Sequence, residues 1–235
     1  MTTIGVPMYL ASKLHKELKT QFSADDIIGH ELTYGQISKK LNSILRPMGA
    51  RIRVCRDPSM KMPRGSVKQK YSFSGYFDTE KKKNAINLCV HLSPSRRKFK
   101  FTKAQYNGFV FMFSQVVQHE FIHESQFAFR PEQSTRKVKV LHSNMLSKKR
   151  LEQIEYLREW CEIDAYAHDI AMEINQYHEN MNPATVIKHI DAHRNLYSYS
   201  VYKQAFKGTD WNRLKKSLLR KIWRWLPSAQ CPVPV

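Results

Sequence analysis

An apolar run from Phe101 to Phe129 carries two histidines and a glutamate near its end: His119, Glu120 and His123. A helix that is apolar on nearly all sides is a buried helix. Thr102 at the start of the run has a glutamine three residues later, which is the form of a capping box. The sequence therefore predicts a buried helix. Its imidazoles and carboxylate need a partner that compensates for their loss of water.

His119 and His123 are four residues apart, so on a helix both imidazoles lie on one face and can bind one zinc ion. Zinc lowers the pKa of bound water from about 15.7 toward 7, and a neighbouring carboxylate can accept the proton as hydroxide attacks a carbonyl. Glu120 is expected to be this general base. The alternative is that the two histidines are hydrogen-bonded members of the core.

In the sequence before this run, the spacing of the hydrophobic residues changes from that of helices to that of strands. Hydrophobic spacing predicts a short helix over 9–20 and a second helix over 34–48 that starts at a capping box at Thr33. Period-two alternation then predicts strands over 50–56, 69–78 and 85–92.

Mostly helices are predicted after the run. The patterns indicate a long helix over 148–178, a helix over 183–195 with Asn182 as N-cap, an aromatic core cluster over 197–206, and a last helix over 211–225 capped by Asp210. That last helix is amphipathic and basic, and it contains tryptophans. Such a helix can lie on a membrane, follow a phosphate backbone or pack on its own domain.

The His-Glu-x-x-His pattern at 119–123 resembles the motif of zincin-type zinc metallopeptidases, and the order of helices, three strands and motif helix is similar to their compact core. The resemblance covers roughly residues 34–175. It implies an α+β fold: a zincin-like core with a small three-stranded sheet packed on the buried motif helix, then a mostly helical C-terminal half. On this basis 1–178 is the peptidase core and 179–235 a helical extension. Strand 85–92 would be the sheet edge that pairs with an extended substrate.

Three residues are candidates for the third metal ligand. Glu162, followed three residues later by alanine, resembles the ligand glutamate of gluzincin-like small intracellular or phage-type peptidases. By that resemblance His119, His123 and Glu162 bind Zn²⁺, and Asp164 and Asp169 can orient them. Glu159 lies one helical turn before Glu162. His142 resembles the third histidine of SprT-like peptidases, which are DNA-associated.

Other metal arrangements have weaker support. The longer metzincin pattern is absent, because Gln126 and Phe129 stand where glycine and histidine are required. His189 and His193 are also four residues apart, but no glutamate follows His189 to act as a base. His168, Tyr166 or Tyr199 could stabilise an oxyanion.

The formal net charge of +19 predicts attraction to nucleic acid or another polyanion. The expected function is therefore a zinc-dependent peptidase that acts on a protein or peptide near such a polyanion. The alternative is a basic nucleic-acid-binding or virion-type structural protein with a zincin-like fold and no proteolytic activity. The last helix leaves membrane attachment open, and the oligomeric state is not indicated.

The four cysteines form no CxxC pair, which suits a reducing compartment. The first residues lack the pattern of a signal peptide, and no run approaches the roughly 20 apolar residues of a membrane span. We therefore expect a cytoplasmic protein, with association to nucleic acid or a virion left open.

Overall fold

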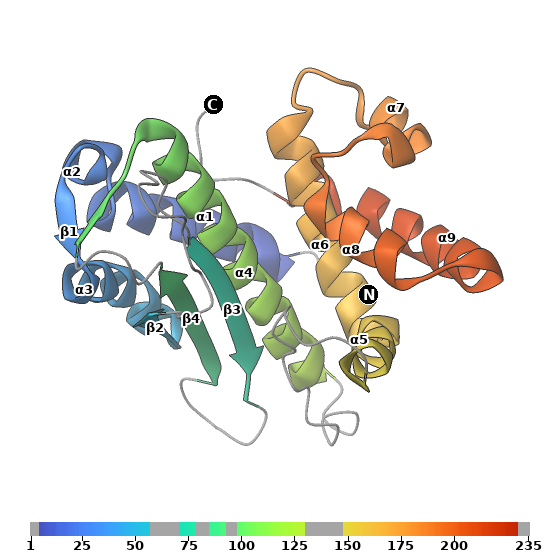
Figure 1. Ribbon diagram of the computed structural model, residues 1–235, viewed down its shortest axis with the longest axis horizontal. Coiled ribbons are helices and arrows are strands. Elements are labelled where there is room, and N and C mark those ends of the chain that lie inside the picture. The colour runs from blue at the N-terminus through green and yellow to red at the C-terminus, as the bar shows by residue number, and fades with distance from the viewer. Residues whose placement is uncertain (1–4, 57–70, 79–84, 93–97, 130–147, 230–235) are drawn as a thin grey trace. The chain divides into compact units, whose positions relative to one another are not determined.

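The computed structural model describes residues 5–56, 71–78, 85–92, 98–129 and 148–229 (Figure 1). It divides into two compact units, one formed by Leu10–Val140 and the other by Met1–Tyr9 with Leu141–Val235. The expected boundary at 178 coincides with neither limit of these units. The fold is mixed α and β, with two small sheets before the motif helix and helices after it in the described residues.

The first unit contains helices around two small sheets. Its elements, the first of which begins in the other unit, are α1 (Gly5–Gln21), α2 (Ala24–Ile27), β1 (Glu31–Thr33), α3 (Tyr34–Leu45), the 3-10 turn η1 (Arg46–Met48), β2 (Ala50–Arg56), β3 (Tyr71–Phe77), β4 (Ile86–Leu92), β5 (Lys98–Lys100) and α4 (Lys103–Phe129). The predicted helices and three strands are confirmed here. The capping box at Thr33 forms, with the Gln36 amide donating to the Thr33 hydroxyl over 3.2 Å.

The main sheet has the order β2-β4-β3, so β4 is its central strand. It pairs in parallel with β2, placing Val90 beside Val54, and antiparallel with β3, placing Leu88 beside Gly75. The expectation that strand 85–92 forms the edge is therefore wrong. The strand is apolar at every second position, and its buried residues include Ile86, Leu88 and Val90, a pattern that a central strand covered on one face also produces.

A second, two-stranded sheet joins β1 to β5, with Leu32 opposite Phe99. The sequence did not predict it. Each strand has only three residues, which is too short for a hydrophobic period to be recognised.

Helix α4 lies beside β3 and runs in the same direction (Figure 1). The helix begins as predicted, because the Thr102 amide donates to Gln105 Oε1 over 3.0 Å and the Gln105 amide donates to Thr102 Oγ1 over 3.2 Å. Gly108 allows close packing, since a Cβ at this position would lie 2.7 Å from the Tyr71 hydroxyl. Aromatic rings fill the space around this contact: Phe22, Tyr71, Phe73, Phe99, Phe101 and Phe109.

The second unit is helical in its described part. Its elements are α5 (Lys148–Arg158), α6 (Trp160–Tyr177), α7 (Pro183–Lys188), the 3-10 turn η3 (Ile190–Ala192), α8 (Tyr197–Ala205) and α9 (Gly208–Trp225). The single helix predicted over 148–178 is wrong, because the backbone of Glu159 is extended (φ −62°, ψ 137°) and separates α5 from α6. The break could not be predicted, because no proline or glycine lies there and the hydrophobic spacing of a helix continues across it.

Helix α6 is the centre of this unit, and α8 and α9 pack on it. The buried Glu173 carboxylate accepts hydrogen bonds from the Ser198 amide, at 3.0 Å, and from the Ser198 hydroxyl, at 2.7 Å. It thereby satisfies an amide in the first turn of α8 and its charge lies at the favourable end of the helix dipole. Tyr199, Tyr202 and Phe206 are buried, so these members of the aromatic cluster are confirmed as core, whereas Tyr197 is 71% exposed and is not part of it.

Two predicted helix ends differ from the structure. Asn182 caps α7 as expected, accepting the Ala184 amide over 2.8 Å, but the helix ends at Lys188 and a 3-10 turn follows. Helix α9 begins at Gly208, with Lys207 as N-cap, so Asp210 lies inside the first turn rather than capping it. No helix in the described part of the chain is long and apolar enough to cross a bilayer.

Asp191 ties η3 to two helices, and its replacement by asparagine tests this connection. It accepts from the Tyr199 hydroxyl at 2.9 Å and pairs with Lys203 at 3.0 Å and with Lys215. The hydrogen bond from Lys215 contributes most to lowering its pKa from 3.8 to about 2, so the ion pairs stabilise the fold above about pH 4 and are lost as the pH falls toward 2.

Because Asp191 is half exposed, we expect Asp191→Asn to lower the melting temperature by only ~2 °C at neutral pH, and the difference to disappear near pH 2. The measurement is thermal unfolding across this pH range, with the exposed Glu179→Gln as control. A difference that does not depend on pH would contradict the ion-pair explanation.

Candidate metal centre

The motif helix supplies two buried imidazoles and one buried carboxylate. His119, Glu120 and His123 expose 8%, 5% and 5% of their surface, and the centroids of the two imidazole rings are 4.9 Å apart. The two imidazoles share one side of α4, as the spacing predicted. The rest of the helix is held in the core by aromatic and branched side chains, so these three polar groups have little freedom to move.

Gln126 positions one of the imidazoles. Its Oε1 lies 3.1 Å from His123 Nδ1. In the tautomer in which Nδ1 donates this hydrogen bond, Nε2 keeps the lone pair that a metal needs, and the ring orientation is fixed. In the sequence Gln126 served only to exclude the metzincin pattern. Its helical spacing of three from His123 was the signal that could have identified it.

Gly75 in the middle of β3 makes room for the Glu120 carboxylate. A Cβ at this position would lie 2.6 Å from Glu120 Oε1, 2.8 Å from Glu120 Cγ and 2.8 Å from Leu88 Cδ2. Any other residue would have to displace the glutamate or the strand. No role was predicted for Gly75, although a glycine inside a strand often marks a close approach of another group.

Glu162 is fully buried and lies in the first turn of α6, because the extended residue 159 starts a new helix at Trp160. A carboxylate in a first helical turn is favoured by the helix dipole. The neighbouring Cys161 is a poor candidate for a thiolate ligand or nucleophile. Burial raises its pKa to about 12, and the charges of Glu162 and Glu159 add to this effect.

The side-chain ligand atoms of His119, His123 and Glu162 all lie within 4.8 Å of one another, and the three residues are buried. The group could hold a metal ion. Two imidazole nitrogens and one carboxylate oxygen are donors that suit zinc, and they leave one position of a tetrahedral ion open. A divalent cation would also offset the cost of burying the carboxylate, which amounts to several kcal/mol when a charge lacks compensation. The donor set therefore fits the ion that the sequence implied.

Of the other two candidate third ligands, only Glu159 lies in the described part of the chain, and it is not in this group. Glu159 is half-buried, and its carboxylate lies 3.7 Å from the Cys161 thiol. His142 lies outside the described residues, as do the basic residues of 57–70.

The residues expected to support the site are placed as follows. Asp164 Oδ1 accepts from Lys221 Nζ at 2.8 Å and from the Trp225 indole at 3.3 Å, so α9 holds this carboxylate. Asp169 is buried, with Oδ1 4.0 Å from His168 Nδ1. Orientation of the ligands by these two aspartates stays a prediction.

All three oxyanion candidates have contacts inside the helical unit. Tyr199 donates to Asp191, and the fully buried His168 ring packs edge-on to Trp225 with centroids 5.2 Å apart. The half-buried Tyr166 ring lies 5.3 Å from that of Tyr202.

The second histidine pair does not lie on one helix. His189 ends α7 with non-helical angles (φ −111°, ψ 26°), and His193 follows η3. His193 instead packs against His178, with ring centroids 4.3 Å apart. The helical spacing that suggested this pair therefore does not occur in the structure.

Metal analysis of ligand variants tests the group directly. We expect the purified chain to bind one zinc ion, and Glu162→Gln or His119→Ala to weaken zinc binding by more than ~100-fold, because loss of a supporting residue alone costs 10–100-fold. Glu159→Gln and His142→Ala are the controls and should retain the metal. The measurement is zinc stoichiometry by mass spectrometry after dialysis. If Glu162→Gln retained zinc and one of the controls lost it, the third ligand would be the residue changed in that control.

Comparison of the chain with protein-family models, with curated proteins and with solved structures found no match. The function is therefore inferred from the buried donor group on α4 and α6 and from the residues around it.

Proposed function

We propose that this protein is a zinc-dependent peptidase with a zincin-like core. The observation that carries the proposal is the buried group of two histidines and one glutamate, with a second glutamate, Glu120, directly beside the first histidine. His119, His123 and Glu162 would hold the ion. When bound, zinc supplies an acidified water and polarises the carbonyl group of a substrate.

Glu120 is the general base in this proposal. It is adjacent to the ligand His119 on α4, and its carboxylate is confined between the helix and Gly75 of β3. Such confinement limits the positions from which the carboxylate can accept a proton and later deliver it to the leaving amine. The rest of α4 serves to fix this geometry rather than to take part in the reaction.

Strand β3 is the part of the sheet that best suits an extended substrate. The central strand β4 is paired on both sides, whereas β3 pairs only with β4 among the described residues. A peptide added to the outer edge of β3 would run past Gly75, which lies against the Glu120 carboxylate. We therefore assign to β3 the substrate-binding role that the sequence suggested for 85–92.

A second candidate function is a basic nucleic-acid-binding or virion-type structural protein without proteolytic activity. The exposed arginines and lysines on one side of α9 favour it. In that case the metal would stabilise the fold, and Glu120 would have no chemical role. The two functions differ in what a change at Glu120 does.

The variant Glu120→Gln tests the proposed function. It keeps the shape of the side chain but cannot accept a proton, so we expect zinc content and melting temperature to be unchanged and hydrolysis to fall by more than ~100-fold. The substrate is a proteome-derived peptide library, with new termini identified by mass spectrometry in zinc-loaded protein. If Glu120→Gln cleaved peptides at the rate of the parent, Glu120 would not be the general base. Absence of cleavage by the parent would favour the structural protein.

Replacement of Gly75 by alanine tests the confinement of Glu120. The added Cβ would meet Glu120 Oε1 and Cγ at less than 3 Å, so the carboxylate must move. A misplaced catalytic group can cost ~100-fold, and we expect kcat to fall by about this factor while zinc stoichiometry is kept. The control is Gly35→Ala in α3, where a Cβ meets nothing closer than 3.9 Å. Unchanged kcat in Gly75→Ala would show that the contact does not position the base.

A further inference from the structure

Helix α9 has one face that packs on its own unit and one face that is exposed, and its charged residues have different partners on the two faces. Leu218, Ile222 and Trp225 are buried on the side that packs against α6. Lys215 and Lys221 also serve the fold, since they pair with Asp191 and Asp164. These contacts confirm one of the roles considered for this helix, that of packing across its own unit.

The other face carries a row of exposed cations. Arg213, Lys216 and Arg220 are exposed and form no ion pair with any described residue. Arg224 follows one turn later with 64% of its side chain exposed, at 3.7 Å from Asp164. Spacings of three and four keep these residues on one side of a helix, and eleven residues extend over about 16 Å. We call these four residues the basic stripe.

An exposed indole lies within the basic stripe. Trp223 is three residues after Arg220 and is 48% exposed, which is unusual for so large an apolar side chain. An accessible aromatic ring among cations is the combination on which an unpaired base stacks while its phosphates are neutralised.

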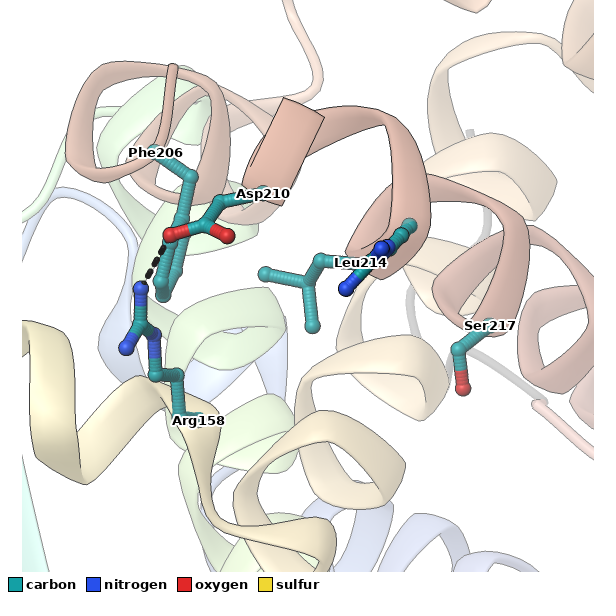
Figure 2. Close-up of a pocket in the computed structure, with 6 residues that line it drawn as sticks. Arg158, Phe206, Asp210, Leu214 and Ser217 are labelled. Atoms are coloured by element: carbon teal, nitrogen blue, oxygen red, sulfur yellow. Dashed lines mark hydrogen bonds and ion pairs between the residues drawn. The ribbon is translucent and has the colours of Figure 1, made fainter. Parts of the chain in front are cut away.

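A shallow pocket of about 300 Å³ lies at the first residue of the stripe (Figure 2). Its lining includes Arg158, Asp210, Arg213, Leu214 and Ser217. Figure 2 shows the Arg158 guanidinium turned toward Asp210, which it meets at 2.5 Å. This pair is electrically balanced, so Arg213 gives the pocket a net positive charge beside an apolar wall.

We propose that the basic stripe with Trp223 binds single-stranded nucleic acid, with the pocket receiving a nucleotide at one end. Cations along the stripe match a chain of phosphates, and the indole offers a surface for one base. A membrane fits less well, because an amphipathic helix inserts its apolar face, and that face of α9 is occupied by α6. The proposal does not depend on the proposed peptidase activity.

The test measures the affinity of the full chain for short single-stranded DNA and RNA oligonucleotides. Binding is monitored by fluorescence anisotropy at several salt concentrations. The triple variant R213Q/K216Q/R220Q removes three phosphate contacts. We expect it to reduce the salt slope by about 2 and the affinity by about 100-fold at ~0.1 M salt. Trp223→Ala should weaken binding about tenfold and leave the salt slope unchanged.

The matched control is K16Q/K19Q/K39Q, which removes the same charge from exposed positions on α1 and α3. It should retain most of the affinity, and an equal loss would overturn the assignment to α9. Tighter binding to duplex than to single strands would overturn the role of Trp223. Binding to anionic phosphatidylserine vesicles in preference to both oligonucleotides would replace the proposal by a membrane surface. The same titrations with Glu120→Gln should be unchanged, which separates this proposal from the peptidase proposal.

Discussion

The close contact between α4 and β3 is the constraint on which the candidate centre depends. Two glycines make it possible: Gly108 on the helix faces the Tyr71 hydroxyl, and Gly75 on the strand faces the Glu120 carboxylate. Between them, the aromatic rings of the first unit fill the core. A polar group buried in such a place cannot move far without opening a cavity or meeting the backbone of the strand. The reactive groups are therefore held by packing as much as by hydrogen bonds.

Much of the first unit could be predicted because its signals are local. The capping boxes at Thr33 and Thr102 use neighbouring residues, and the alternation over 50–56 matches β2 at both ends. The arrangement of the strands could not be predicted in the same way. Burial at every second residue of β4 fits an edge or a central strand equally, and only its pairing with β2 and β3 distinguishes them.

In the candidate centre, too, local features could be predicted from the sequence and long-range features could not. The spacing of His119 and His123 followed from helix geometry alone. Glu162 came from a resemblance, since helix geometry relates only residues on the same helix and the motif and Glu162 lie on different predicted helices. Glu159 also has the same side chain one turn earlier. The structure distinguishes the two glutamates through a backbone feature, the break before Trp160, which no residue type announced. Gly75 and Gln126 were missed because each acts on another residue rather than on the ion.

Helix α9 divides its positions between folding and contact with the surroundings. The residues that anchor it, Leu218, Ile222 and Lys221, are different from those that face solvent, Arg213, Lys216 and Arg220. Substitutions on the outer side therefore leave the packing of the unit intact, while truncations of the buried side chains on the inner side would destabilise it. Natural variation in this helix can then proceed at two independent rates. The surface chemistry of the protein is free to be retuned for a new partner without any cost to the scaffold beneath.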